Sequence, residues 1–478
     1  MQNLTMLTDL YELTMLAGYR RHGMGNRRAV FYMFYRGASE LSYAVMAGNA
    51  QFKEYILGLR FSREDISYLR SLGIFEEDFL SSLEHFRFEG DIDIMPEGTI
   101  VFPGEPLVRV KAPLSQAQLI ETAMLNLIGH QTLIATKGNR VSRAAKGDKV
   151  MEFGLRRAQG PDAGVLGARA AIVGGCHATS NVMAGQRFGI PVSGTHAHSW
   201  VMSFPDELTA FRAYASIFPD GCLLLVDTYD TLRSGVPNAI RVFEELKARG
   251  HKPLGIRLDS GDLAYLSREA RAMLDAAGFE TAKIVVSNSL DEYTITSILD
   301  QGGRIDAFGV GERMITARSE PVFGAVYKLC AVAGPDGAFQ PRIKISETVA
   351  KITNPGLKQV YRVYNADGKA VADLITGPEG IDTDAVRTGY RFADPERPWK
   401  KREFKNCTAK PLQSRVMAGG RRTGPAVSVR DIAAYVRRQL AEEIWEEEQR
   451  FENPHKHYID MSPEYYAMKM RMLEESHG

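Results

Sequence analysis

A series of short apolar runs between residues 149 and 311 constrains the fold of this chain most strongly, because each run ends in small or polar residues. Amphipathic stretches with helical spacing separate the runs, and this alternation predicts βα units around a parallel sheet. The polar segments lie at 153–160, 176–181, 194–199, 227–230, 259–262, 287–289 and 309–311. Parallel α/β sheets and barrels place active sites at the carboxyl ends of their strands. The arrangement therefore predicts an enzyme.

The flanking regions predict a second kind of module. Between residues 90 and 112, short strands separated by proline and glycine turns indicate an antiparallel unit, and strands near 325–333, 342–345 and 358–364 return to it. Helices are expected over 4–22 and 115–145, after the capping residue Ser428, and from Ser462-Pro463 onward. We therefore expect a helical and antiparallel β module over 1–145, an α/β barrel with the active site over 146–325, and a segment over 326–478 that returns to the β module and adds terminal helices.

The composition argues against several classes of protein. A net charge of +1 with 24% charged residues does not fit a nucleic-acid-binding protein. No apolar stretch approaches the length of a membrane span, and the first residues lack a secretory pattern, so we expect a soluble, cytoplasmic protein. The four cysteines are far apart and form no CxxC pair, which fits a reducing compartment. His455 and His457 have the spacing of a metal-binding pair, but the stretch lacks a third ligand.

His198 is the candidate for acid, base or nucleophilic chemistry. His196 and His198 follow one apolar run, and on a strand end only one of them can face the site. Asp227 ends a neighbouring run, and a carboxylate on the ring N–H of a histidine fixes its tautomer and raises its basicity. The alternative is a core histidine bonded to a carbonyl group. No serine stands in a nucleophile elbow, so a hydrolase triad is not predicted.

The remaining polar ends suit a phosphorylated sugar and a small anion. Asp259 and Asp262 can accept hydrogen bonds from the hydroxyls of a sugar diol or bind a magnesium ion. Arg156, in an arginine pair after the first run, predicts an anion site. Late in the series, Ser287-Asn288 and Gly309-Val310-Gly311 offer backbone N–H groups of the kind that hold a phosphate.

Together these motifs resemble those of the nicotinate phosphoribosyltransferase family over essentially the whole chain. The matching segments are Thr8-Asp9-Leu10-Tyr11, Glu152-Phe153-Gly154-Leu155-Arg156-Arg157-Ala158-Gln159-Gly160, Gly194-Thr195-His196-Ala197-His198-Ser199, Arg257-Leu258-Asp259-Ser260-Gly261-Asp262 and Phe308-Gly309-Val310-Gly311. The resemblance implies an α/β fold, with an irregular (β/α) barrel and a discontinuous α+β module built from both ends of the chain.

The resemblance also implies a reaction, in which nicotinate and phosphoribosyl pyrophosphate give nicotinate mononucleotide and pyrophosphate for NAD biosynthesis. ATP would be a co-substrate coupled through a phosphohistidine at His198, and Mg²⁺ a cofactor whose ligands stay unassigned. Thr195 and Arg257 would hold nicotinate, Asp259 the ribose hydroxyls, and Gly309 and Gly311 the 5′-phosphate.

Three further positions follow from the resemblance. Tyr11 would reach the site across a homodimer interface and stack on the pyridine together with the aromatic residue at Phe153. Ser180 occupies the position where related nicotinamide enzymes carry an aspartate, and a serine leaves room for the carboxylate of nicotinate. Glu312 departs from the threonine of many relatives. Because a carboxylate cannot donate to a phosphate, we expect Glu312 to point away and backbone N–H groups to bind there.

Other interpretations remain open. A relative acting on nicotinamide or quinolinate would share most of these motifs. A phosphohistidine phosphocarrier, in which His198 passes phosphate to a partner protein, would leave Tyr11, Phe153 and the Asp259 cluster without a role. An inactive barrel used as a binding module is the third alternative, and the intact set of polar strand ends argues against it.

Overall fold

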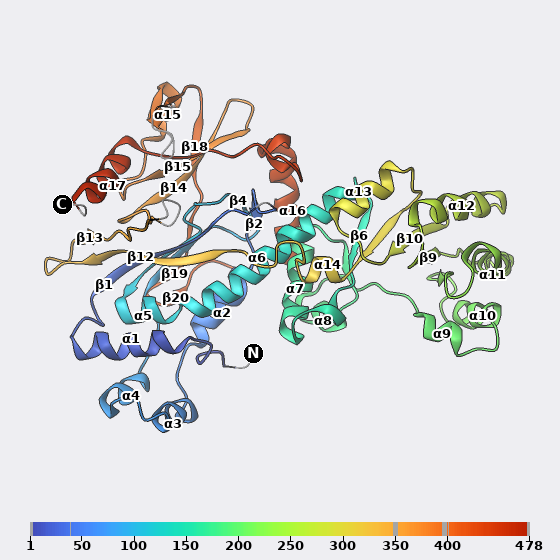
Figure 1. Cartoon of the computed structure of the whole chain (residues 1–478), viewed down its shortest axis with the longest axis horizontal. Coiled ribbons are helices and arrows are strands. Elements are labelled where there is room, and N and C mark those ends of the chain that lie inside the picture. The colour runs from blue at the N-terminus through green and yellow to red at the C-terminus, as the bar shows by residue number, and fades with distance from the viewer. Residues whose placement is uncertain (1–2, 39, 348–351, 394–398, 400, 476–478) are drawn as a thin grey trace. The chain divides into compact units, whose positions relative to one another are not determined.

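The computed structural model describes residues 3–38, 40–347, 352–393, 399 and 401–475 (Figure 1). The chain forms two compact units: unit 1 comprises Met1–Leu133 and Val322–Gly478, and unit 2 comprises Ile134–Pro321. Segments from both ends of the chain thus share unit 1. The domain boundaries expected from the sequence stay a prediction. No helix among the described residues is long and apolar enough to cross a membrane.

Unit 2 is built on a six-stranded sheet in the order β7-β6-β11-β10-β9-β8. Its strands are β6 (Lys149–Glu152), β7 (Ala178–Thr179), β8 (Leu223–Leu225), β9 (Gly255–Leu258), β10 (Lys283–Ser287) and β11 (Ala307–Val310). All neighbouring pairs are parallel, which confirms the expected parallel α/β core. Closure into a barrel is not confirmed, because the hydrogen-bonded order of the described strands ends at β7 on one edge and at β8 on the other.

Helices connect these parallel strands, as the alternating sequence pattern predicts. They are α7 (Pro161–Gly174), α8 (Val182–Phe188), α9 (His198–Met202), α10 (Glu207–Ile217), α11 (Val236–Ala248), α12 (Leu263–Ala276), α13 (Glu292–Asp300) and α14 (Glu312–Ile315), with the short helices η1 (Leu155–Arg157) and η2 (Thr231–Gly235). Helix α7 packs beside β6 and β7, and α12 packs beside β9 and β10 (Figure 1). The buried apolar strands thereby present their carboxyl ends along one edge of the sheet.

A glycine sets the spacing of two of these strands. Gly255 begins β9 with a φ of +151°, and a Cβ at this position would stand 2.0 Å from the carbonyl oxygen of Lys283 on β10. Any other residue would force the strands apart here. The close pairing carries Arg257 on β9 alongside Val285 on β10, two residues before Ser287.

Unit 1 contains two larger sheets and one strand pair. A seven-stranded sheet has the order β13-β12-β1-β5-β3-β19-β20, a six-stranded sheet the order β17-β16-β21-β15-β14-β18, and β2 pairs with β4. The strands are β1 (Arg28–Tyr35), β2 (Ala44–Val45), β3 (Asp91–Ile94), β4 (Ile100–Val101), β5 (Val108–Pro113), β12 (Ala325–Ala333), β13 (Phe339–Pro341), β14 (Gln359–Tyr364), β15 (Ala370–Thr376), β16 (Tyr390–Ala393), β17 (Lys401–Phe404), β18 (Thr408–Pro411), β19 (Ser414–Ala418), β20 (Arg421–Arg422) and β21 (Ile459–Met461). Strand β1 pairs antiparallel with both β5 and β12, which confirms the expected return near 325–333. The expected strand near 358–364 forms as β14 but belongs to the other large sheet, and the described residues 342–345 form no strand.

The helices of this part of the chain follow the expected pattern with shorter bounds. They are α1 (Leu10–Arg21), α2 (Asn49–Gly58), α3 (Arg63–Ser71), α4 (Glu77–Leu83), α5 (Leu114–Leu119), α6 (Glu121–Ala144), α15 (Thr383–Thr388), α16 (Val429–Arg438) and α17 (Pro463–Glu475), with η4 (Gln439–Glu443) and η5 (Glu446–Gln449). Helix α6 runs across the boundary of the two units. Ser428 caps α16 by accepting a hydrogen bond from the backbone N–H of Asp431, as predicted.

Buried ion pairs stabilise the second sheet of unit 1. Arg362 on β14 donates through Nε and Nη2 to the two carboxylate oxygens of Asp373 on β15, at 2.9 and 2.7 Å. His457 lies against this pair, with Nε2 3.4 Å from Asp373, Nδ1 2.9 Å from Glu448 and its ring stacked on Phe102. Carboxylates and an aromatic ring therefore occupy the surroundings of His457. No group of three possible metal ligands occurs among the described residues.

Candidate active site

Three side chains from adjacent strands form the centre of the candidate site in unit 2. Arg257 on β9 donates from Nε to the hydroxyl of Ser287 on β10 at 2.9 Å, and from Nη2 to Asp259 at 2.8 Å. The Ser287 hydroxyl also donates a short hydrogen bond to the same oxygen of Asp259. Burial by itself would raise the pKa of Asp259, but the Ser287 hydroxyl and the Arg257 charge together hold it below its usual value. Asp259 is therefore ionised at neutral pH.

Asp227, after β8, holds the loop that carries Asp259. One oxygen of its carboxylate accepts hydrogen bonds from the backbone N–H of Asp259 and from the hydroxyl of Ser260, both at 2.7 Å. The sequence predicts that Asp227 orients His198, and in the structure this carboxylate instead orients the Asp259 loop. The physical reason is that the strand ends of β8 and β9 are neighbours, so the nearest donors to Asp227 belong to the loop after β9.

His198 begins the short helix α9 and stands between two oxygen atoms. Its Nδ1 lies 3.1 Å from the hydroxyl of Thr228, and its Nε2 lies 3.7 Å from the second oxygen of Asp259. The side chain is 40% exposed, so solvent and solutes reach the ring. Thr228 was missed by sequence reasoning because a threonine beside an aspartate carries no signal of its own. The tertiary structure brings it to the ring.

His196 is buried in the protein, unlike His198. It is buried, its Nε2 accepts a hydrogen bond from the backbone N–H of Leu225 at 3.3 Å, and its ring packs edge-on against Tyr214. Burial lowers the pKa of His196, which keeps the ring neutral. The expectation that only one of the two histidines faces the site therefore agrees with these contacts, although His198 lies on a helix and not on a strand.

Phe153 is positioned by a buried carboxyl group and by a glycine. Glu152, fully buried, accepts hydrogen bonds from the backbone N–H of Gly154 and from the hydroxyl of Thr179 on β7, the latter at 2.6 Å. Burial raises the pKa of Glu152. A Cβ on Gly309 would come within 2.6 Å of the Phe153 ring, so the glycine makes room for that ring. The guanidinium carbon of Arg257 lies 5.6 Å from the ring centre. Sequence reasoning missed the role of Glu152 because a strand-end glutamate reads as a surface residue.

The loops after β10 and β11 have unusual backbone geometry. Asn288 and Ser289 have φ values of +98° and +47°, a left-handed conformation that L side chains adopt at a cost of about 1–3 kcal/mol. Such strain clusters at binding sites, where the surrounding structure enforces it. Gly311 precedes α14, and a Cβ there would lie 3.0 Å from the carbonyl oxygen of Phe153. The loop after β11 therefore holds its backbone close to the Phe153 segment.

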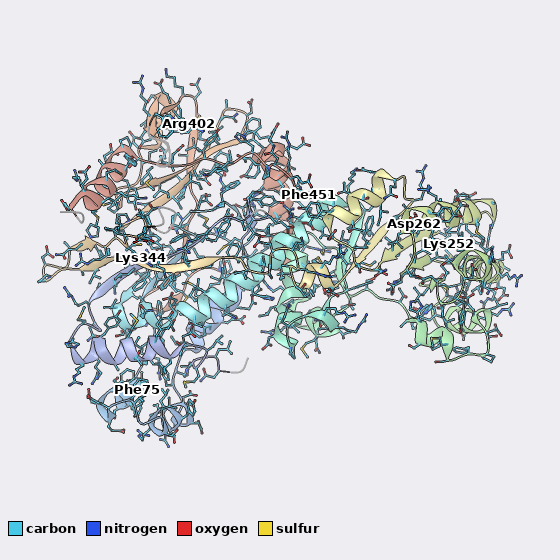
Figure 2. All side chains as sticks on the ribbon, viewed as in Figure 1. Phe75, Lys252, Asp262, Lys344, Arg402 and Phe451 are labelled. Carbon is cyan, nitrogen blue, oxygen red and sulfur yellow. The ribbon has the colours of Figure 1, made fainter. Side chains whose placement is uncertain are left out.

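Three further charged residues were predicted to lie near the site: Glu312, Arg156 and Asp262. Glu312 pairs with Arg318 at 3.1 Å and with Arg157 at 3.9 Å, so its carboxylate faces arginines, and its expected direction away from a phosphate stays a prediction. Arg156 lies exposed on η1. Asp262, labelled in Figure 2, caps α12 by accepting from the backbone N–H of Tyr265 at 3.0 Å.

The other predicted site residues are more loosely connected. Thr195 is half-buried and its hydroxyl bonds the carbonyl oxygen of His196 at 3.0 Å. Ser180 follows β7, and its backbone N–H donates to the carbonyl oxygen of Glu152 at 2.9 Å, which places it at the strand end next to Phe153. Tyr11 belongs to unit 1, where its side chain is 46% exposed on α1.

The carboxylates offer limited means of holding a metal ion. One oxygen of Asp227 is buried and has no hydrogen-bond partner, while Asp259 has an oxygen directed to His198. Among the described residues, no cluster supplies three His, Cys, Asp or Glu ligands. Mg²⁺ commonly binds proteins through one or two carboxylates together with substrate phosphates. The donor set therefore fits a magnesium ion that arrives with a phosphorylated substrate, and it does not form a closed protein cage.

Comparison with known proteins gives one consistent result. The N-terminal domain model of nicotinate phosphoribosyltransferase matches residues 6–129, the family model matches 149–333, and the C-terminal domain model matches 357–469. The nicotinate phosphoribosyltransferase of Bacillus subtilis is 45% identical over 475 residues, covering 99% of this chain and 96% of that protein. That of Homo sapiens is 33% identical over 467 residues, covering 85% and 84%. The crystal structure of human nicotinic acid phosphoribosyltransferase superposes with a TM-score of 0.86 at 29% identity, covering 97% of this chain and 99% of the human chain.

The contact between Ser287 and Asp259 gives a testable prediction. In Ser287→Ala the hydroxyl that lowers the pKa of Asp259 is lost, so this pKa should rise toward its usual value and the carboxylate should take up its proton at a higher pH. Carboxyl-detected NMR titration measures the change, with the signal assigned through Asp259→Asn. Ser297→Ala, on the exposed face of α13, serves as the control. An unchanged midpoint in Ser287→Ala would contradict the geometry described here.

Proposed function

The chain belongs to the nicotinate phosphoribosyltransferase family, and on that premise we propose that it transfers the phosphoribosyl group of phosphoribosyl pyrophosphate to nicotinate. The ring nitrogen of nicotinate forms a bond to C1 of the ribose while the bond from C1 to pyrophosphate breaks, giving nicotinate mononucleotide for NAD biosynthesis. The observation that carries the proposal is the cluster of Arg257, Asp259, Ser287 and His198 at the carboxyl ends of neighbouring parallel strands.

Nicotinate would bind between Arg257 and Phe153. Arg257 uses Nε and one Nη2 hydrogen for Ser287 and Asp259, and its remaining donors are open to a carboxylate. A hydrogen bond to a charged group contributes about 1.5–3 kcal/mol. The Phe153 ring offers a face for the pyridine, because Gly309 lets it lie flat against β11. Thr195 and Ser180 would complete the pocket.

The phosphoribosyl group would lie across the ends of β9, β10 and β11. Asp259 would accept hydrogen bonds from the ribose hydroxyls, and its fixed negative charge would stabilise the positive charge that develops at C1. Asp262, Ser287, Asn288, Gly309, Gly311 and Arg156 are the proposed contacts for the sugar and its phosphates. Mg²⁺ would bind the pyrophosphate with Asp227 and Asp259 as carboxylate ligands and neutralise charge on the leaving group. Positioning of two reactants alone supplies much of such a transfer rate.

We propose that ATP phosphorylates His198. If Nδ1–H donates to Thr228, the lone pair on Nε2 is free to attack the terminal phosphorus of ATP, and ADP leaves. Thr228 is then the positioning residue for the ring, the part that sequence reasoning gave to Asp227. Hydrolysis of the phosphohistidine would drive the transfer toward product and accounts for a ligase classification.

The active site is proposed to be shared between two copies of the chain. Tyr11 presents a half-exposed ring from unit 1, and the family resemblance gives this residue a stacking role on the pyridine. A homodimer would let unit 1 of one copy complete the strand-end site of its partner.

The choice of pyridine tests the function directly. With labelled pyridines and phosphoribosyl pyrophosphate, we expect nicotinate mononucleotide as the product and a strong preference for nicotinate over nicotinamide. Ser180→Asp should lower kcat/KM for nicotinate at least tenfold, because two carboxylates repel each other by about 1.4 kcal/mol or more. Ser180→Asn, of similar size and uncharged, is the matched control. Equal efficiency of the unaltered protein on both pyridines would assign it to the nicotinamide enzymes.

Replacing His198, the proposed site of phosphorylation, should abolish the stimulation by ATP without abolishing the basal transfer. His198→Ala should lose the stimulation by ATP and keep measurable ATP-independent transfer, since the sugar and pyridine contacts remain. Thr228→Val should weaken the stimulation severalfold without abolishing it. His251→Ala, at a histidine paired with Asp220, is the control. The measurement is ADP released per nicotinate mononucleotide formed, and continued stoichiometric ATP hydrolysis by His198→Ala would refute the assignment.

Complementation tests the shared site. Tyr11→Ala and His198→Ala proteins should each lack ATP-stimulated activity, and a mixture with exchanging subunits should regain part of it. The hybrid dimer contains one site with both residues intact. Subunit exchange is followed by a fluorescent label on one variant, and exchange without any recovery would count against a composite site.

A further inference from the structure

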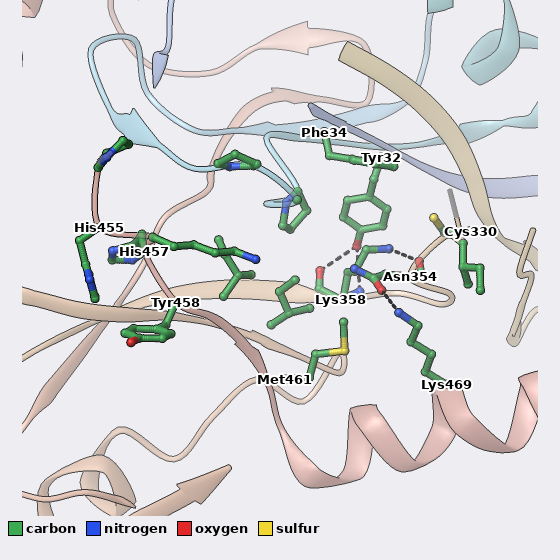
Figure 3. Close-up of a pocket in the computed structure, with 18 of the residues that line it drawn as sticks. Tyr32, Phe34, Cys330, Asn354, Lys358, His455, His457, Tyr458, Met461 and Lys469 are labelled. Atoms are coloured by element: carbon green, nitrogen blue, oxygen red, sulfur yellow. Dashed lines mark hydrogen bonds between the residues drawn. The ribbon is translucent and has the colours of Figure 1, made fainter. Parts of the chain in front are cut away.

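Unit 1 contains a cavity of about 880 Å³ to which none of the proposed catalytic residues contributes (Figure 3). It lies among β1, the segment 447–459, β21 and α17, and all of its lining residues belong to unit 1. Sites for small organic ligands typically enclose about 300–1,000 Å³. This cavity, named the unit 1 cavity below, is therefore large enough for a ligand of the size of a nucleotide.

The lining of the unit 1 cavity carries an excess of positive charge. Lysine and arginine contribute four side chains to the described lining, and Glu447 contributes its one carboxylate. The four cations are Lys358, Arg450, Lys456 and Lys469. Arg450 is exposed and has no ion-pair partner among the described residues. Such a surface attracts an anion.

Lys358 is the unusual member of this set because its charge is buried. The residue is 3% exposed, its Nζ donates to the carbonyl oxygens of Asn354 and Gly356 at 2.8 and 3.3 Å, and it lies 3.6 Å from the centre of the Tyr32 ring. No described carboxylate pairs with it. Burial lowers the pKa of Lys358. An ammonium group without a counter-charge is costly inside a protein, and an anionic ligand would supply that charge.

A second lysine approaches the same point. Lys469 on α17 donates from Nζ to the side-chain oxygen of Asn354 at 2.8 Å, so Asn354 holds two ammonium groups, one through its backbone and one through its side chain (Figure 3). Two ammonium groups at one residue are charged donors of the kind that a phosphate accepts through its terminal oxygens.

The rest of the lining is aromatic and apolar. Tyr32 lines the cavity with a buried ring: its hydroxyl is bonded to the backbone of Lys358, and the Lys358 Nζ lies 3.6 Å from the ring centre, so this ring offers no free face to a ligand. Tyr458 and His455 stand at the other side, with ring centres 5.5 Å apart (Figure 3). The Arg402 guanidinium already lies over the Tyr458 ring, 2.9 Å from its centre, so a flat heterocycle would stack on the exposed His455 ring beside Tyr458. The cavity thus combines positive charge, which suits a phosphate, with aromatic side chains, which suit a flat heterocycle.

We propose that the unit 1 cavity is a binding site for a nucleoside monophosphate, with the phosphate at Lys358, Lys469 and Arg450 and the base against His455 and Tyr458. Binding here is a property of unit 1 and does not depend on the strand-end chemistry of unit 2. A ligand held by Lys358, Tyr458 and Lys469 would connect the segments that precede β14 and β21 with the terminal helix α17.

Calorimetric titration of the full chain tests the proposal, with AMP, adenosine and inorganic phosphate as probes. We expect one AMP bound per chain through this cavity, with both adenosine and phosphate at least tenfold weaker. Lys358→Met keeps the side-chain length without the charge and should weaken AMP at least tenfold. Arg450→Ala, at an exposed position, should weaken it severalfold and decides the matter if Lys358→Met does not fold.

Two matched variants show where the ligand binds. Lys410→Met removes an exposed lysine of β18 outside the cavity, and Arg257→Ala alters the strand-end site; both should leave AMP binding unchanged. Unchanged affinity in Arg450→Ala and Lys358→Met, or loss of binding in Arg257→Ala, would overturn the proposal. Phosphate binding as tight as AMP would overturn the assignment of a nucleoside. None of these outcomes depends on the transferase assay, so the proposed function stands or falls separately.

Discussion

The carboxylate of Asp227 fixes the arrangement on which the candidate active site depends. By accepting the backbone N–H of Asp259 and the Ser260 hydroxyl, it ties the loop after β9 to the end of β8. Asp259 then stands between Arg257 on β9, Ser287 on β10 and His198 on α9. Donors around a half-buried carboxylate favour its charged form. The network therefore sets both the geometry and the protonation state of the site.

Packing around Phe153 shows a second constraint of the same kind. The ring needs space on β11, which Gly309 provides, and a fixed turn, which the buried carboxyl of Glu152 provides through Gly154 and Thr179. The strained φ values at Asn288 and Ser289 persist next to this rigid region. Free energy invested in buried hydrogen bonds and close packing thus holds the strand-end loops in conformations that they would not adopt alone.

Two buried cationic side chains of unit 1 differ in whether a carboxylate compensates their charge. Arg362 and Asp373 neutralise each other in a bidentate pair, a geometry that compensates for the loss of solvent. Lys358 has two carbonyl oxygens, the Cys330 thiol and the Tyr32 ring as neighbours and no described carboxylate, and it lines a large cavity. The charge of Arg362 is neutralised within the protein, whereas a bound anion would neutralise the charge of Lys358. This contrast is the physical basis for a ligand site in the part of the chain that lacks the catalytic residues.

The sequence by itself determined the parallel α/β core, because the period of apolar runs between residues 149 and 311 is a local property. It also determined which segments end in polar residues, and the family resemblance rested on those segments. Only the tertiary structure decided the partners: Thr228 and not Asp227 lies at His198, and Glu152 is a buried support of the Phe153 turn. The strand order places β8 beside β9, and no local sequence pattern predicts that order. Hydrogen bonds between side chains depend on such long-range neighbours, whereas secondary structure depends mainly on periodicity, and that is the physical reason for the difference.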